Sequence, residues 1–315
     1  MKTIIVNHVS TISLFLIITL TSCGTTDPED NTNYHNKILF ASSRSGIEQL
    51  YMMNPDGSDI KQITSGEFSH GGGRWSPDAS RIVAGTNEEW STACYSHMVL
   101  MNSNGTNRQL LNCGSRMSWS PDGEKIAFIY LPSAELGDKS RYVYVLNVSD
   151  YKYVKITKKS GLIVGNPCWS SDGNYIYFSS NEHDPLNNKP EIYEMNNDGT
   201  NIVRLTVTPN GYSTSPSISP DGTMIAFVTK REGLSTPAIF IMNIDASDQK
   251  KIIESPSGEV FNYPRWSSDA SALIFVSGLT DGSAETLIYT VNIDGTNLKK
   301  IISDDNSANS PDWSK

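Results

Sequence analysis

The chain has 315 residues and a formal net charge of −9 at pH 7, with 19% charged and 37% hydrophobic residues. This negative balance argues against a nucleic-acid partner, because phosphates require a basic surface. The length exceeds that of a usual single domain, but no linker interrupts the repeat that begins at residue 37, so we expect one folded domain.

The first 22 residues have the organisation of a secretion signal. Lys2 is followed by a mainly apolar run over residues 12–20 and then by small polar residues. This run is too short to span a bilayer as a mature helix. The ending Leu20-Thr21-Ser22-Cys23 resembles the bacterial lipobox, which implies that Cys23 is the lipid attachment site. The alternative is an ordinary signal that happens to carry a cysteine.

Residues 23–36 are polar and acidic, with Asp27, Glu29 and Asp30, and predict a disordered tether. Acyl chains on Cys23 would hold the protein at a membrane. Gly24 follows the cysteine, which by resemblance to lipoprotein sorting rules favours the outer membrane over the inner one. We therefore expect a lipid-anchored protein of the bacterial cell envelope, on either the periplasmic or the surface-exposed side.

From residue 37 onward a Trp-Ser pair or its equivalent recurs at steps of 44 to 50 residues, close to the length of one four-stranded propeller blade. The six tryptophan positions are Trp75, Trp119, Trp169, Ile218, Trp266 and Trp313.

Each repeat contains the signals of four strands. A turn such as Ser120-Pro121-Asp122-Gly123 follows the tryptophan: proline presets φ, Asp bonds its own backbone, and glycine takes the left-handed corner. Next come a buried strand such as residues 126–129, a hairpin such as Asn196-Asn197-Asp198-Gly199, and a closing strand such as residues 203–206. We interpret the many turn aspartates as turn formers and not as a carboxylate array.

The two ends of the repeat region predict how it closes. It opens with a second-type strand at residues 38–42 and stops after a first-type strand at residues 310–314. Pairing this C-terminal strand with the first three N-terminal strands gives an all-β, six-bladed β-propeller of four-stranded blades with no sheet edge left open.

The Trp-Ser-Pro-Asp-Gly turn, the Ile-Ala-Phe strand and the Met-Asn-x-Asp-Gly hairpin resemble the TolB-like, WD40-like (PD40) propeller repeat family over residues 37–315. Ser43-Arg44-Ser45-Gly46 with residues 50–54 is the best single match. The resemblance implies binding work in the periplasm or at the cell surface. TolB proper has an α/β domain ahead of its propeller, whereas only the short tether precedes the first strand here, so we expect a relative and not TolB itself.

The cysteines are consistent with an oxidising compartment. Folding the hairpin about Ser103-Asn104 places Cys94 opposite Cys113, which predicts a cross-strand disulfide. Two reduced, buried thiols are the alternative. Cys168, beside Pro167 and Trp169, is predicted to be a packing residue.

The sequence has no zinc-protease, Cys-x-x-Cys or EF-hand motif, no Gly-x-Ser-x-Gly elbow and no phosphate-binding Gly-Lys-Ser/Thr loop. We therefore predict no catalytic residues, no metal and no cofactor.

The turns after the first and third strands are short and nearly constant, whereas the other two kinds of connection vary from blade to blade. The variable loops meet around one mouth of the channel, where we expect a ligand. Arginine and aromatic residues are enriched in binding hot spots. The candidates for this ligand face are Arg44, His70, Arg74, Trp90, Arg116, His183, Arg231, Tyr263 and Arg265. Alternatively, such aromatics fill gaps between blades and the charges are solvated.

One repeat position, directly before the tryptophan, holds Arg74, Ser118, Cys168, Ser217, Arg265 and Asp312. If this position faces the channel, Arg74, Arg265 and Asp312 could select an acidic peptide terminus or a carboxylate sugar. If it faces the neighbouring blade, they are structural ion pairs.

These patterns predict a monomeric, membrane-tethered, non-catalytic binding module that engages a protein partner in the envelope or outside the cell. A glycan-binding or carbohydrate-active lipoprotein is the alternative, suggested by Trp90, Tyr263 and acidic loop residues. A purely structural scaffold is a third interpretation.

Overall fold

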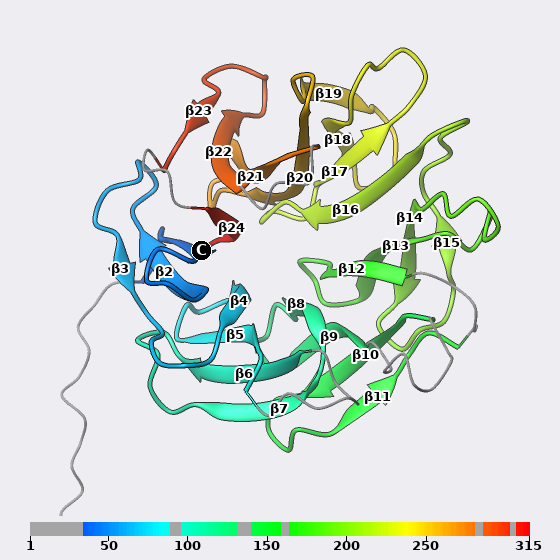
Figure 1. The fold of residues 1–315 in the computed structure, drawn as a ribbon. Helices are drawn as coiled ribbons and strands as arrows, with labels where there is room; N and C mark the ends of the chain where they lie inside the picture. The colour runs from blue at the N-terminus through cyan, green and yellow to red at the C-terminus, as the bar shows by residue number, and fades with distance from the viewer. Residues whose placement is uncertain (1–33, 89–95, 131–139, 159–163, 281–285, 303–306) are drawn as a thin grey trace, which may run out of the picture. The chain divides into compact units, whose positions relative to one another are not determined.

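The computed structural model describes residues 34–88, 96–130, 140–158, 164–280, 286–302 and 307–315. In these ranges every regular element is a β-strand, and the strands form six four-stranded antiparallel sheets. Figure 1 shows the sheets arranged as blades around a centre. The predicted six-bladed β-propeller is confirmed.

The strands of each blade are given from the centre outward. The first blade is β24 (Ala308–Trp313), β1 (Ile38–Ser42), β2 (Gln49–Met53) and β3 (Lys61–Gln62). The second is β4 (His70–Trp75), β5 (Arg81–Thr86), β6 (His97–Asn102) and β7 (Gln109–Cys113). The third is β8 (Ser115–Trp119), β9 (Lys125–Tyr130), β10 (Tyr142–Asn147) and β11 (Tyr153–Lys155). The fourth is β12 (Val164–Trp169), β13 (Tyr175–Ser180), β14 (Glu191–Asn196) and β15 (Val203–Arg204). The fifth is β16 (Tyr212–Ile218), β17 (Met224–Lys230), β18 (Ala238–Asn243) and β19 (Lys250–Glu254). The sixth is β20 (Glu259–Trp266), β21 (Ala272–Leu279), β22 (Thr286–Asn292) and β23 (Lys299–Lys300).

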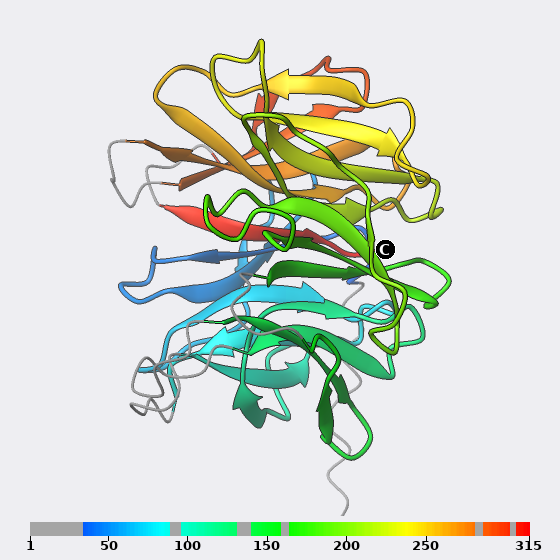
Figure 2. The same cartoon turned by 90° about the vertical axis from the view of Figure 1, so that its right-hand side faces the viewer.

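The first blade is closed by the C-terminal strand, as predicted. β24 pairs with β1 in the register Ile38↔Trp313 and Leu39↔Asp312. Beyond the strand, the Ser314 amide donates to the Lys37 carbonyl at 2.9 Å. Figure 2, turned by 90°, shows β24 in red beside β1 in blue. Because this pairing joins the two ends of the repeat region, β1 has a partner on both sides.

The hydrophobic core lies between neighbouring blades. Leu39 and Leu50 of the first blade share one buried cluster with Trp75 and Ile82 of the second. Two of the tryptophans also bond the preceding blade: the Trp119 indole donates to the carbonyl of Arg74 at 3.2 Å. The Trp266 indole makes the same bond to Ser217, at 2.9 Å. Each buried cluster therefore combines side chains from two neighbouring blades.

The turn aspartates bond their own turns, as predicted. Ser267 Oγ donates to Asp269 at 2.6 Å and accepts the Ala272 amide at 3.0 Å, while Asp269 also accepts the Ser271 amide at 3.0 Å. The corner residue Ala270 has φ of 57°. The same network recurs at Asp78, Asp122, Asp172 and Asp221.

Within the described ranges, no helix is long and apolar enough to cross a membrane. The predicted signal peptide and residues 23–33 of the predicted tether lie outside those ranges. Residues 34–36, which the sequence assigns to the tether, contact the propeller: Tyr34 packs on Trp75 at 5.8 Å between ring centroids, and Asn36 accepts the Trp313 indole at 2.8 Å.

The turn aspartates predict how the stability of the propeller depends on pH. The bond from Ser267 and the Ser271 amide lower the pKa of Asp269 from 3.8 to about 2, and the equivalent serine bonds lower the pKa values of Asp172 and Asp221. A depressed folded-state pKa adds stability above the unfolded value, and this stability is lost as the pH falls toward the folded value. We expect the thermal midpoint to be level above pH 5 and to fall between about pH 4 and pH 2.

Calorimetry of a variant with Asn at residues 172, 221 and 269 tests this expectation. Its midpoint should be lower at pH 7 and should fall less between pH 4 and pH 2. Glu232→Gln, at an exposed loop carboxylate, should leave the wild-type profile unchanged. An equally steep fall in the triple variant would contradict the assignment.

Candidate functional site

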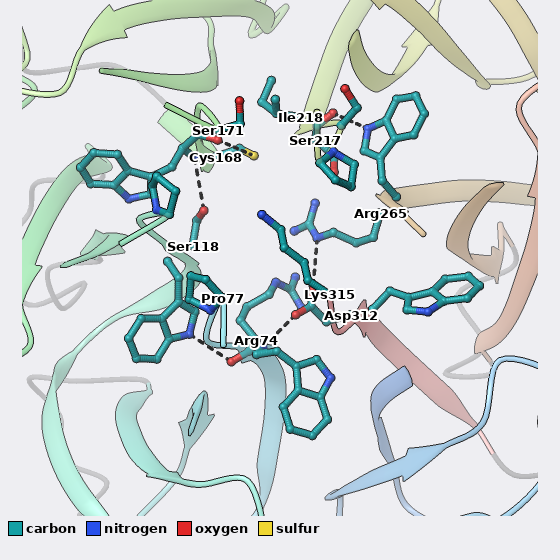
Figure 3. Close-up of a pocket in the computed structure, with 18 of the residues that line it drawn as sticks. Arg74, Pro77, Ser118, Cys168, Ser171, Ser217, Ile218, Arg265, Asp312 and Lys315 are labelled. Atoms are coloured by element: carbon teal, nitrogen blue, oxygen red, sulfur yellow. Dashed lines mark hydrogen bonds and ion pairs between the residues drawn. The ribbon is translucent and has the colours of Figure 1, made fainter. Parts of the chain in front are cut away.

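The residues directly before the tryptophan positions face the channel. Together they line one cavity of about 170 Å³ beside the tight turns, which we call the turn-side cavity (Figure 3). These residues are Arg74, Ser118, Cys168, Ser217, Arg265 and Asp312. This arrangement agrees with the first of the two orientations considered from the sequence, in which the position faces the channel.

Some of these side chains also form hydrogen bonds or ion pairs with a neighbouring blade. Asp312 Oδ2 accepts the backbone amide of Trp75 at 2.9 Å, and its other oxygen lies 3.8 Å from Arg265 Nε. Ser118 Oγ accepts the amide of Trp169 at 3.3 Å. Burial raises the pKa of Asp312, and the cations of Arg74 and Arg265 oppose this shift. Asp312 is thus both a channel residue and a structural ion-pair partner.

Arg74 is held at the centre of the channel by carbonyl oxygens. Its Nη1 donates to Gly73 at 2.7 Å and to Ser310 at 3.4 Å. Its buried Nε has no hydrogen-bond partner. Burial and the neighbouring Arg265 lower the pKa of Arg74 to about 10, so the side chain stays positively charged at neutral pH.

Every inner strand carries a β-bulge on the channel side. The residue three positions before the tryptophan has left-handed backbone, with φ between 51° and 64°, and the pairing with the second strand skips there. We call these six residues the bulge ring: Gly72, Arg116, Asn166, Ser215, Tyr263 and Ser310. Such backbone is strained for residues other than glycine, and a bulge changes the direction of its side chain.

Members of the bulge ring from different blades contact one another. Arg116 Nη1 donates to Asn166 Oδ1 at 2.6 Å and to the Tyr263 hydroxyl at 3.2 Å. The Arg116 guanidinium carbon also lies 5.5 Å from the Tyr263 ring centroid. Asn166 in turn donates to Ser215 Oγ at 3.3 Å. Residues from the third, fourth, fifth and sixth blades are therefore joined.

The bulge ring borders a second cavity, of about 460 Å³, on the side of the variable loops. We call it the channel-mouth cavity. Its charged lining consists of Arg74, Arg116, Arg141, Arg265 and Glu48. The Glu48 carboxylate accepts a hydrogen bond from Asn309 at 2.7 Å. In a chain with net charge −9, this cavity is locally positive.

Arg141 was not among the residues singled out from the sequence. Burial, and next the charge of Arg116, lower its pKa. Among the described residues its guanidinium makes no hydrogen bond or ion pair. Arg141 directly precedes the third strand of its blade, β10, which begins at Tyr142, and this place in the fold brings it to the cavity.

The bulge ring does have a sequence signal. Gly72 and Asn166, residue types that tolerate left-handed backbone, share one repeat position.

Four of the nine predicted ligand-face residues line the channel-mouth cavity: Arg74, Arg116, Tyr263 and Arg265. Trp90 lies outside the described residues. Arg44 and Arg231 occupy equivalent places and lie over aromatic rings of their own blades, with guanidinium carbons 5.0 Å from the Tyr51 centroid and 4.5 Å from the Phe240 centroid. These two arginines cover their own blades and do not line the cavity.

His70 is not available to a ligand. Its side chain is 0% exposed, its Nδ1 bonds Gln49 at 3.2 Å, and its Nε2 accepts from Arg108 at 2.7 Å. Burial and the charge of Arg108 lower its pKa to about 4, so it is neutral at pH 7. Assigning His70 to the ligand face from its place at the start of an inner strand was wrong, because that strand begins inside the core.

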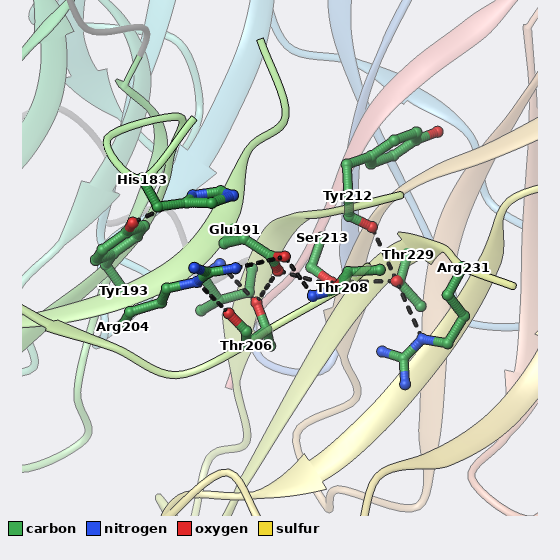
Figure 4. A network of polar contacts seen from close by, with 11 residues as sticks. His183, Glu191, Tyr193, Arg204, Thr206, Thr208, Tyr212, Ser213, Thr229 and Arg231 are labelled. Carbon is green, nitrogen blue, oxygen red and sulfur yellow. Dashed lines mark hydrogen bonds and ion pairs between the residues drawn. The ribbon is translucent and has the colours of Figure 1, made fainter. Parts of the chain in front are cut away.

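His183 is exposed and lies 3.4 Å from the Tyr193 hydroxyl, next to a buried network in the fourth blade (Figure 4). The fully buried Glu191 accepts from Thr206 at 2.5 Å and from Arg204 at 3.2 Å. In the first blade, Gln49 accepts from Thr64 at 2.6 Å in the same way. This network fixes the outer strand to the third strand, and it was not among the features predicted from the sequence.

All four cysteines bear on the sequence predictions. Cys113 is disulfide-bonded, and Cys94, its predicted partner, lies outside the described residues, so the pairing stays a prediction. Cys23 also lies outside them. Cys168 is a free, partly buried thiol that lines the turn-side cavity. Burial raises its pKa, which disfavours the nucleophilic thiolate. In the described part of the chain, no three His, Cys, Asp or Glu residues are grouped as metal ligands would be.

Comparison with protein families and curated proteins gives one consistent group. The family described as "TolB beta propeller domain" (PD40) matches residues 112–315. The protein TolB homolog of Chlorobium luteolum is 27% identical over 211 residues, 67% of this chain and 35% of that protein. The Tol-Pal system protein TolB of Francisella tularensis is 31% identical over 114 residues, 35% of this chain and 25% of that protein. The matches thus span about a third or less of these relatives.

Solved structures show the same fold. TolB from Acinetobacter baumannii has a TM-score of 0.73 at 20% identity, covering 90% of this chain and 67% of that one. An oligogalacturonate lyase in complex with manganese has a TM-score of 0.59 at 14% identity, covering 85% and 74%. At these identities the likeness concerns the fold alone.

The backbone of Arg116, with φ of 55°, predicts an unusual response to glycine. Left-handed backbone costs a non-glycine residue about 1 kcal/mol, so Arg116→Gly should leave the thermal midpoint unchanged or raise it. Arg116→Val should lower the midpoint by several degrees, because a β-branched side chain is least tolerated there.

Calorimetry of both variants measures this difference. Ser115→Gly is the matched control: it precedes the bulge in the same strand, where glycine should cost about 0.5–1 kcal/mol. Equal losses for Arg116→Gly and Ser115→Gly would show that Arg116 is needed for stability.

Proposed function

The chain belongs to the PD40 family, the TolB β-propeller domain, and from this premise we propose that it is a non-catalytic binding module. Its loop face would receive a protein partner in the bacterial envelope or at the cell surface. The observation that carries the proposal is the channel-mouth cavity, into which side chains of separate blades converge at strained positions. Strained backbone of this kind is concentrated at functional sites.

Several features favour binding over catalysis. Buried His70 is neutral and bonded on both ring nitrogens. The raised pKa of Cys168 keeps its thiol protonated. The arginines of the channel-mouth cavity hold fixed positive charge, which suits recognition of an anionic group more than proton transfer. The oligogalacturonate lyase shares only the fold, and fold alone does not carry an activity to this chain.

The names of the relatives support an envelope partner. One is a Tol-Pal system protein and another is a TolB homolog. Binding of a uronic-acid glycan is the second candidate function, because Tyr263 and several arginines line the same cavity. The two candidates differ in the ligand class and share the site.

Crosslinking in cells tests the proposed function. A photo-reactive amino acid in place of Asn87, which lines the channel-mouth cavity, should capture one envelope protein that mass spectrometry identifies. The same amino acid in place of Glu124, which is exposed after a tight turn, should capture none. Capture from neither position, or the same protein from both, would contradict the proposal.

We also propose that Cys23 carries the lipid that tethers the module, with the outer membrane as the favoured location. The lipobox-like ending at residues 20–23 and Gly24 support this proposal. Cys23→Ala should release the protein from the membrane fraction and abolish incorporation of labelled palmitate, whereas Cys168→Ala should change neither. Membrane fractionation of Cys23→Ala after a high-salt wash would overturn the anchor.

A further inference from the structure

The channel-mouth cavity has an excess of positive charge that the described residues do not neutralise. Four guanidinium groups line it, from Arg74, Arg116, Arg141 and Arg265, against the single carboxylate of Glu48. Glu48 is already engaged, since it accepts from Asn309 at 2.7 Å. It also lies directly against Gly71, where an added Cβ would come within 2.4 Å of its Oε2.

The four arginines fall into two pairs. Arg74 and Arg265 also line the turn-side cavity, where Asp312 supplies a counter-charge 3.8 Å from Arg265 Nε. Arg116 and Arg141 have no such counter-charge in the part of the chain that the structure describes. Arg116 donates only to the neutral oxygens of Asn166 and Tyr263, and Arg141 has no bonded partner among the described residues.

The position of Arg116 is built into the fold. Its left-handed backbone at the β-bulge turns the side chain into the channel, and the contact with the Tyr263 ring and hydroxyl fixes its direction. Like charges held close together are unfavourable, and the charge of Arg116 acts on Arg141. An anion between the two guanidiniums would remove this repulsion and would gain charge-assisted hydrogen bonds.

We propose that the protein partner inserts a carboxylate group, carried by an acidic segment, between Arg116 and Arg141 beside Tyr263. The inference rests on the proposed function and adds the chemistry of the ligand. A planar guanidinium pairs with a carboxylate through two parallel N–H···O bonds. A cavity of about 460 Å³ is within the range of sites that hold a small ligand, so it accepts a short acidic stretch and leaves the rest of the partner on the loop face.

Binding of a labelled hexaglutamate peptide to the purified full chain, followed by fluorescence anisotropy, is the first test. Hexaglutamate should bind at least about 10-fold more tightly than hexaglutamine, and Arg116→Gln and Arg141→Gln should each weaken it by about 10-fold. Lys61→Gln removes an exposed charge on an outer strand. This control should change the affinity for hexaglutamate no more than a small increase in salt concentration does. Unchanged binding in both arginine variants, with unchanged thermal midpoints, would overturn the site.

Two further probes separate the possible sources of the anion. Tri-galacturonate and inorganic phosphate are titrated against the same protein. The proposal is supported if hexaglutamate binds more tightly than tri-galacturonate and phosphate and if its binding depends on Arg116 and Arg141. Preferential binding of tri-galacturonate or of phosphate through these residues overturns the peptide assignment, in favour of a glycan or a phosphate ligand respectively.

Crosslinking from residue 87 distinguishes this inference from the proposed function. In the Arg116→Gln, Arg141→Gln double variant, the captured partner should be lost while expression and the thermal midpoint are kept. A partner captured equally well by the double variant would leave the binding function standing and overturn the carboxylate site. Failure of the parent chain to capture any partner would contradict the proposed function, while the peptide titration would still decide whether the cavity binds carboxylates.

Discussion

In each inner strand, the residue three positions before the tryptophan position adopts left-handed backbone, and the pairing with the second strand skips at that point. Both the core and the site depend on this bulge. After it, the strand returns to register, so that tryptophans such as Trp119 and Trp266 bond the preceding blade. At the bulge, the side chain is freed from the sheet and enters the channel. One backbone irregularity thus separates the residues of the strand that pack between blades from those that face the channel.

The distribution of charge follows from the same geometry. Six inner strands meet at the centre, so any charged residue they carry is brought close to others. Asp312 shows how such crowding is tolerated: one oxygen holds the Trp75 amide and the other lies near Arg265. Farther toward the loops, no carboxylate among the described residues pairs with Arg116 or Arg141, and a chain that is acidic as a whole becomes positive there. The two ends of the channel thus differ in their charge.

The propeller is shared by proteins of different kinds, so the fold alone does not carry a function. A TolB and an oligogalacturonate lyase both resemble this chain in fold. In this chain, Arg116, Asn166 and Tyr263 of the bulge ring come from three blades and form one hydrogen-bonded group. The arginines at the outer ends of the second strands, Arg44 and Arg231, cover aromatic rings of their own blades and leave the centre to this group.

The sequence alone determined the blade count, the closing strand and the role of the turn aspartates, because the signals that specify them are local or repeat at a fixed interval. The bonds of Asp269 span only a few residues, so the residue types of the turn are sufficient to predict them. Of the residues singled out from the sequence, four line the channel-mouth cavity: Arg74, Arg116, Tyr263 and Arg265.

Only the tertiary structure decided which of these residues share a cavity. Arg116 and Tyr263 are 147 residues apart and meet only after the blades have closed into a ring. No sequence pattern marks Arg141, which lines the channel-mouth cavity. His70 has the sequence position of a channel residue, but its side chain is buried in the core. Convergence at a channel depends on the direction of each side chain, and that direction is set by the bulges and by the packing between blades, which no single repeat contains.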